Sequence, residues 1–294
     1  MPGFVLAPFR GLRFDEAAVG DLGTVISPPY DVLDADTVRS LEAANRRNIV
    51  RLILSRRFER PYLAVRDRLE QWRERSYLRA DPTPGLYVYE YVVGGIAVRG
   101  LIGLVGLRQE QERIVLPHED VMAGPVDDRT VLMRTTHTNL EPILLVHDGS
   151  ARLREVIDDV VRHPPLADFV ALDGSAHRLW SIHEQDALAG IAGELAGTQA
   201  LIADGHHRYA AYLRLQAELR GKDTEAGRSP WDYGLAMLVD RHEGRLGVGP
   251  IHRSVAAVTM ADLSEVCAER SDRLCEQPDR EAALAAQAAH AGRA

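Results

Sequence analysis

The sequence is almost without lysine, and this shortage excludes two common kinds of site. Of the 35 basic residues only Lys222, in the stretch "RGKDTE", is a lysine. A P-loop needs its lysine in a Gly-Lys-Ser/Thr motif, and a Schiff-base enzyme would have to use this single polar position. Any phosphate group must therefore be bound by arginine side chains and main-chain N–H groups.

Cysteine and long apolar runs are also scarce. Cys267 and Cys275 are the only cysteines, and their spacing matches no metal motif, so we expect reduced thiols in a cytoplasmic protein. Apolar stretches such as "GLIGLVGL" fall short of the roughly 18 residues that a membrane-spanning helix needs. The first residues lack the basic start and the apolar run of a signal peptide. We therefore expect no membrane as a partner.

The remaining composition is that of a folded globular protein. Hydrophobic residues make up 46% and charged residues 27% of the 294-residue chain, which is long enough to bury a sizeable core. The formal net charge of −8 argues against nucleic acid as a partner.

Hydrophobic patterning in the first half predicts both helices and strands. Helices are expected at 34–45 and 61–77, and strands at 48–55, 86–93 and 96–107. Gly94-Gly95 predicts a hairpin between the last two strands. The polar stretch 108–139 is predicted to be a long loop of the kind that carries function.

In the second half, predicted helices and strands alternate. The helices are expected at 151–162, 186–196 and 206–220, and the strands at 141–148, 167–173, 177–183, 199–203, 233–240 and 245–251. We predict one two-lobed region over 1–255, with lobes of roughly 1–150 and 151–255. An alanine-rich helical tail follows at 256–294.

The stretch "ALIADGHHRYAA" places polar side chains where a strand meets a helix. Unpaired N–H groups at a helix start, together with the helix dipole, favour an anion. Gly205 permits a close approach or a positive φ, and Arg208 offers two parallel donors to phosphate oxygens. His206 and His207 add further donors. The stretch therefore predicts a phosphate or nucleotide site.

Asp204 needs a separate explanation, because its negative charge would repel a phosphate. It could bind Mg²⁺ or a substrate hydroxyl, which makes it a candidate catalytic and metal-binding residue. It could instead cap the helix that follows.

The stretch "LPHEDVMAGPVDDR" gathers carboxylates, an imidazole and an arginine. It is not a zinc protease motif, because Met122 stands where His-Glu-x-x-His needs its second histidine. As an active-site loop, it would use Glu119 and His118 to bind a substrate amine or Mg²⁺, and Arg129 or Arg134 to bind a phosphate. As a surface loop it would simply be solvated.

Two further segments carry candidate residues. In "SPPYDV" the prolines stiffen the backbone before Tyr30, a candidate substrate contact, and Asp31. Asp31 could act as a general base, bind Mg²⁺ or cap the next helix. His252 and Arg253 end a predicted strand, where α/β proteins often bind substrates.

These motifs resemble known families. The stretch "ADGHHRYAA" is similar to the Gly-x-x-Arg-x-x-Ala box of the ParB/sulfiredoxin-like superfamily, whose members bind nucleotide phosphates at a helix start. More closely, the chain over about residues 7–255 resembles the bacterial and archaeal family of domain of unknown function 1015. The resemblance rests on these stretches, in order: "PFRGLR", "SPPYDV", "LYVYEY", "LPHEDVMAGPVDDR", "TNLEPILLV", "HRLWSI", "IADGHHRYAAY" and "GPIHR".

The resemblance implies an α+β fold, a ParB/sulfiredoxin-like mixed sheet with flanking helices that is elaborated by an N-terminal α/β half. Free-serine kinases of this superfamily have a similar Asp-Gly-His-x-Arg box, and an acidic residue near the N-terminus serves as their base. By position, that residue is Asp31. Sulfiredoxin-like reduction is not expected, because His206 stands where that chemistry needs a cysteine.

We therefore expect a nucleotide-dependent kinase that phosphorylates the hydroxyl of free serine or a similar small molecule. ATP or ADP would be the donor and Mg²⁺ the cofactor. Asp31 or Glu119 would take the hydroxyl proton, while His207 and Arg208 steady the transferred group. The alternative is a non-catalytic nucleotide-binding sensor or protein-interaction module of the ParB-like type. A homodimer is compatible with either.

Overall fold

The computed structural model describes residues 3–54, 61–220, 229–242 and 259–269, together with residues 277, 278 and 282. The chain divides into two compact units, Met1–Leu246 and Gly247–Ala294. The described part of the second unit contains helix α9 (Met260–Glu269), in the segment predicted to be an alanine-rich helical tail. The predicted strand at 245–251 lies outside the described residues.

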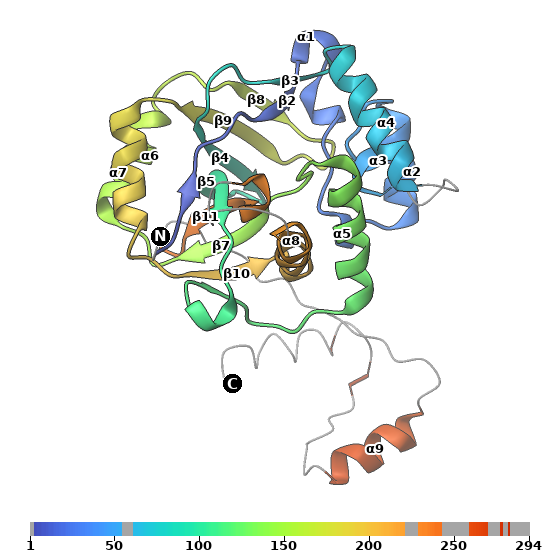
Figure 1. Cartoon of the computed structure of the whole chain (residues 1–294). Coiled ribbons are helices and arrows are strands. Elements are labelled where there is room, and N and C mark those ends of the chain that lie inside the picture. Colours follow the sequence, from blue (N-terminus) through green and yellow to red (C-terminus); the bar gives the residue numbers. More distant parts are fainter. Residues whose placement is uncertain are drawn as a thin grey trace. The chain divides into compact units, whose positions relative to one another are not determined.

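The larger unit is built on a mixed sheet of nine strands (Figure 1). Eight strands follow the order β6–β10–β7–β11–β5–β4–β9–β8, and β1 pairs with β5 beyond the start of β4. The strands are β1 (Leu6–Ala7), β4 (Leu86–Val93), β5 (Ile96–Gly106), β6 (Val115–Leu116), β7 (Ile143–His147), β8 (Ala167–Val170), β9 (Ala176–Ile182), β10 (Ala200–Asp204) and β11 (Tyr233–Asp240). The predicted α+β class is therefore confirmed, and both predicted lobes contribute strands to one sheet.

The predicted hairpin at the centre of this sheet is present. Val93 pairs with Ile96, and the turn between them consists of Gly94 and Gly95. Their φ angles are +57° and +78°, in the region that a two-residue hairpin turn of the favoured type requires at both positions.

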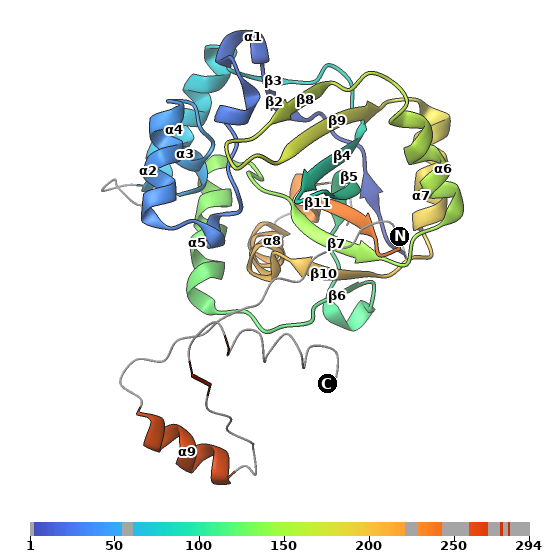
Figure 2. The ribbon, with the colours of Figure 1, turned by 180° about the vertical axis from the view of Figure 1, so that it is seen from behind.

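Helices that follow the central hairpin lie on two sides of the sheet. In both views α6 (Ala151–Val160) and α7 (Gln185–Leu195) lie together on one side, and α5 (Ala123–Thr136) and α8 (His206–Leu219) lie on the opposite side (Figures 1 and 2). On α7, Leu188, Ile191 and Leu195 recur at helical spacing and are all buried in the main core. Within the described ranges, no helix combines the length and apolar content that crossing a lipid bilayer requires.

Smaller elements lie near the N-terminus, and some of them form a second core. They are α1 (Glu16–Val19), α2 (Ala35–Ala44), α3 (Val50–Ile53), α4 (Pro61–Glu74), and the strand pair β2 (Leu12–Phe14) and β3 (Leu78–Ala80). Val65, Leu69 and Trp72 of α4 pack with Leu52 of α3 and Leu132 of α5. This second core therefore packs against α5 through Leu132.

The prediction of a strand at 48–55 was wrong, because Asn48 organises a helical turn there. Its side-chain carbonyl accepts a hydrogen bond from the N–H of Val50, and its amide donates to the main-chain oxygens of Thr24 and Ile26. The short helix α3 then buries Val50, Leu52 and Ile53. A fully buried apolar run has no periodicity that separates a strand from a helix.

The prediction of a long loop over 108–139 was also wrong. The segment contains the 3₁₀ turn η3 (Glu110–Glu112), strand β6 and the fourteen-residue helix α5. Gly124 and Pro125 suggested a loop, but they lie in the first turn of α5, where proline removes no intrahelical hydrogen bond.

Candidate functional site

Three strands bring distant parts of the chain to one end of the sheet. β6 runs parallel to β10, with Leu116 opposite Leu201, so the segments that follow both strands leave the sheet together. β7 is antiparallel to β10, with Leu144 opposite Asp204, so the segment before β7 reaches the same end. Three segments therefore meet around the first turn of α8: 117–122, 139–142 and 205–208.

The corner between β10 and α8 depends on Gly205. Its φ is +92°, and a Cβ added there would lie 2.8 Å from Cγ2 of Ile143, so a side chain fits poorly. Helix α8 begins at the next residue, His206, and no described side chain caps it. The N–H groups of its first turn are therefore available to an anion, and the helix dipole favours negative charge there.

Imidazole rings surround this helix start. His206 is only 3% exposed, and its Nε2 accepts a 3.3 Å hydrogen bond from the main-chain N–H of His118. The His118 ring lies edge-on to the His206 ring, with centroids 4.4 Å apart, and its Nδ1 lies 2.6 Å from the main-chain oxygen of Ile202. His207 Nε2 accepts a 3.1 Å bond from the N–H of Met122. These bonds hold the segment after β6 against the start of α8.

Glu119 completes a cluster with two of these histidines. Its Oε1 lies 3.0 Å from Nδ1 of His206, but the direction is wrong for a hydrogen bond, so this buried Nδ1 has no hydrogen-bond partner among the described residues. Burial lowers the pKa of His206, although the Glu119 carboxylate opposes this effect. One donor atom each from His118, Glu119 and His206 lies within 4.8 Å of the other two. Divalent metal ions accept this set of donors.

Arg208, the predicted phosphate ligand, is buried and already has two oxygen partners. Its side chain is 5% exposed, and the guanidinium donates to the main-chain oxygen of Pro142 and pairs with Asp204. Asp204 therefore neutralises Arg208 and does not cap α8. The Asp204 side chain remains 46% exposed, so solvent reaches the carboxylate but not the guanidinium.

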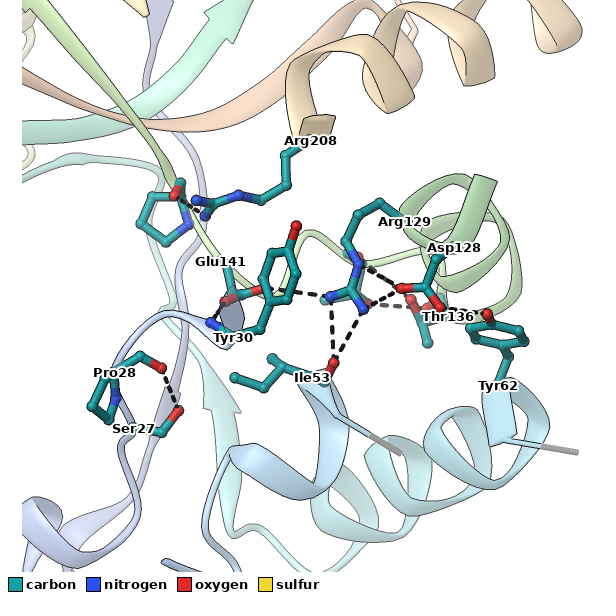
Figure 3. A network of polar contacts seen from close by, with 12 residues as sticks. Ser27, Pro28, Tyr30, Ile53, Tyr62, Asp128, Arg129, Thr136, Glu141 and Arg208 are labelled. Atoms are coloured by element: carbon teal, nitrogen blue, oxygen red, sulfur yellow. Dashed lines mark hydrogen bonds and ion pairs between the residues drawn. The ribbon is translucent and has the colours of Figure 1, made fainter. Parts of the chain in front are cut away.

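A second buried arginine lies beside this corner (Figure 3). Arg129 of α5 is 5% exposed, pairs with Asp128, and has its Nη1 3.6 Å from an oxygen of Glu141. The Tyr30 ring packs on the Arg129 guanidinium, with Cζ 4.4 Å from the ring centroid. The Tyr30 N–H also donates a 3.3 Å bond to Glu141. Tyr30 and Arg129, predicted as a substrate contact and a phosphate ligand, therefore belong to one network.

Glu141 is the member of this network that the sequence did not reveal. Burial raises the pKa of its carboxyl group, while the positive charges of Arg208 and Arg129 oppose the rise. The available signal was an acidic residue between a loop and an apolar strand. Pro142, the next residue, restricts Glu141 to the extended backbone needed at the entry to β7.

Asp31, the predicted base, lies at the edge of the same network. It follows Tyr30 in the 3₁₀ turn η2 (Tyr30–Val32) and is exposed. It is close enough to Glu141 that its charge contributes to the raised pKa of that residue. The Asp31 side chain is thus accessible to a substrate, while the preceding residue, Tyr30, is held in place.

Arg134, another predicted phosphate ligand, is not brought to the corner. Arg134 pairs with Glu218, which lies about 18 Å along α8 from the helix start. His252 and Arg253 lie outside the described residues.

Comparison with models of protein families identifies the family of this chain. A family model described as "Protein of unknown function (DUF1015)" matches residues 6–287. The chain belongs to the DUF1015 family. No curated protein and no solved structure matched it. The DUF1015 match includes every described residue of the site, from Tyr30 to Arg208.

This DUF1015 protein also has a cavity of about 910 Å³ next to the segment that enters β7. Leu140 and Pro142, the two neighbours of Glu141, line it together with apolar residues of the sheet such as Ile102 and Leu235. Small-molecule sites commonly have volumes of about 300–1,000 Å³. The charged network therefore adjoins a space large enough for a small molecule.

Proposed function

We propose that this DUF1015 protein is a nucleotide-dependent kinase that phosphorylates the hydroxyl of free serine or a similar small molecule. The observation that carries the proposal is the uncapped first turn of α8, with His118 and His207 held beside it. Catalysis of phosphoryl transfer consists mainly of positioning and charge neutralisation, and such a helix start supplies both. The similarity of the Asp-Gly-His-His-Arg stretch to the box of the free-serine kinases, in the ParB/sulfiredoxin-like superfamily, is a second line of support.

Phosphate binding is assigned to the main-chain N–H groups of residues 205–208 and to His207. Because the Arg208 guanidinium is buried and paired, its contribution is to fix the neighbouring groups. It holds Asp204 at the end of β10 and the Pro142 carbonyl at the start of β7. Its positive charge adds to the potential that favours an anion at the helix start.

Two accessible carboxylates fit a magnesium nucleotide. The side chains of Asp204 and Glu119 are 46% and 53% exposed. The negative charge of each acts to raise the pKa of His206, so both carboxylates are near this ring. Mg²⁺ prefers oxygen ligands and is usually held by one or two carboxylates together with substrate phosphates. A bound magnesium nucleotide would supply the phosphoryl group and neutralise charge on it.

Asp31 is the candidate base. Its carboxylate is exposed, while the preceding Tyr30 is fixed against Arg129 and Glu141. A carboxylate held at one point can accept the proton of a substrate hydroxyl as that oxygen attacks the phosphorus.

Nucleotide binding tests the proposal directly. We expect ATP or ADP with Mg²⁺ to raise the melting temperature of the wild-type protein. Arg208→Lys should lose this shift, because lysine cannot hold Asp204 and Pro142 together, whereas the matched change Arg134→Lys, near the other end of α8, should keep it. Incubation with a panel of hydroxy amino acids and detection by ³¹P NMR would then identify the acceptor. Binding without any phosphorylated product would contradict the kinase and favour the sensor.

A further inference from the structure

We propose that His118, Glu119 and His206 bind a divalent transition-metal ion. The three donor atoms lie within 4.8 Å of one another, and two of the three side chains are imidazoles. This site shares Glu119 with the carboxylate pair assigned to a magnesium nucleotide, but its other two ligands are imidazoles. Its existence does not depend on kinase activity.

The spacing of two of the ligands already suits one ion. Ligands that lie about 2.0–2.2 Å from a shared metal are roughly 3–3.5 Å apart. Glu119 Oε1 and His206 Nδ1 are 3.0 Å apart, yet they do not form a hydrogen bond with each other. A buried nitrogen without a partner is unfavourable, and a metal ion at this point would satisfy it.

His118 is held in the tautomer that a metal requires. Its Nδ1 lies 2.6 Å from the main-chain oxygen of Ile202, and a carbonyl oxygen can only accept a hydrogen bond. The proton of the neutral ring is therefore on Nδ1, and Nε2 carries a lone pair. Histidine ligands of metals typically donate their second N–H to a carbonyl or carboxylate in this way.

His206 supplies the second imidazole from a different part of the chain. Binding a metal through Nδ1 puts the His206 proton on Nε2, so the His118 N–H, whose 3.3 Å contact with Nε2 is long for a hydrogen bond, must move away when the metal binds. His118 and Glu119 are exposed, so a small shift of their segment can close the cluster around an ion while His206 stays fixed in α8.

The donor set decides the class of metal. The sequence has no second histidine at position 122, but the structure provides one at position 206 through the pairing of β6 with β10. Imidazole donors favour ions such as Zn²⁺, Fe²⁺ or Co²⁺ over Mg²⁺. Three protein ligands leave coordination positions free for water or a phosphate oxygen beside the start of α8.

Titration of the metal-free, full-length protein with Co²⁺ tests this site, because Co²⁺ in a protein site absorbs visible light. We expect one Co²⁺ per chain, displaced by Zn²⁺ and not by a large excess of Mg²⁺. His118→Ala and Glu119→Gln should weaken binding by at least about 10–100-fold. The matched controls His163→Ala and Asp120→Asn, at exposed positions outside the cluster, should bind Co²⁺ as the wild type does.

Equal Co²⁺ affinity in His118→Ala and His163→Ala would overturn the proposal, as would displacement of Co²⁺ by Mg²⁺. The replaced side chains are exposed, and circular dichroism would verify that each variant is folded. No nucleotide is present in this titration. Its result is therefore independent of whether the protein binds ATP or phosphorylates a substrate.

Discussion

Arg129 and Glu141 form an ion pair with 3.6 Å between Nη1 and the carboxylate, although their side chains are only 5% and 13% exposed. A buried pair of this kind adds little net stability, but loss of one partner leaves a charge without compensation in a poorly solvated place. Tyr30 contacts both residues, so the pair also fixes the turn that presents Asp31.

Removing the positive partner should therefore destabilise the protein strongly. We expect Arg129→Met to lower the free energy of unfolding by about 3–5 kcal/mol, because Glu141 would keep its buried position without its nearest guanidinium. Arg134→Met removes a half-exposed pair from the same helix and should cost no more than about 1 kcal/mol. Urea denaturation measures the free energy of unfolding of both variants. Similar losses in the two would show that burial of the Arg129–Glu141 pair is not the deciding factor.

Gly205 should be intolerant of a side chain. With φ at +92° and Ile143 2.8 Å from the position of an added Cβ, Gly205→Ala is expected to cost about 1–3 kcal/mol. Gly193, inside α7, has no atom within 4 Å of an added Cβ, so Gly193→Ala should stabilise by about 0.5–1 kcal/mol. The melting temperatures of the two variants should shift in opposite directions from that of the wild type. A lower melting temperature in both would contradict this account.

The buried His177 should make stability depend on pH. Burial lowers its pKa below the ordinary 6.5, although Asp173 opposes the effect, and the ring is enclosed by hydrogen bonds to Tyr89 and Ser175. His177 therefore binds a proton more readily in the unfolded chain than in the folded one. Its contribution to the free energy of unfolding is fully present above pH 6.5 and is lost as the pH falls toward its lowered pKa in the folded protein.

Melting temperatures measured between about pH 5 and pH 7.5 check this expectation. His177→Gln should flatten the acidic side of the curve, while His163→Gln, at an exposed position, should leave its shape unchanged. An unaltered slope in His177→Gln would assign the acid sensitivity to other groups.

The proposed base gives a prediction about turnover. With serine or another accepted hydroxyl compound, Asp31→Asn should reduce kcat by about 10²–10⁴-fold, because the amide cannot accept the hydroxyl proton. The nucleotide-induced thermal shift should remain. Asp36→Asn replaces another exposed aspartate five residues away and should retain full turnover; loss of activity in both variants would remove Asp31 from this role.

Local patterns were enough to predict most of the large elements. Helical spacing located α2, α4, α6, α7 and α8, and the Gly94-Gly95 turn located the central hairpin. Each of these signals lies within the element itself. The segment around Asn48 failed, because its helical turn is set by hydrogen bonds to Thr24 and Ile26 on another segment.

The same distinction applies to the site. The corner at Gly205 and the start of α8 were predicted because strand, glycine and helix follow one another in sequence. The cluster of His118 with His206 was not, because it joins residues that are 88 positions apart through one pair of strands. Nor could the sequence pattern show that Asp204 would neutralise Arg208. The roles predicted for Asp204, as a ligand of Mg²⁺ or a hydroxyl or as a helix cap, all left the Arg208 guanidinium unpaired.

Strand β6 is only two residues long, lies at the end of the sheet order and, among the described strands, pairs with β10 alone. Stability within a protein is uneven, and a short edge strand opens at a lower free energy than the sheet behind it. Amide hydrogen exchange should therefore be faster at Val115 and Leu116 than at the central residues of β5. The half of the site that follows β6 can detach and return while the other half stays in place, so a ligand bound between them can be released without opening of the central sheet.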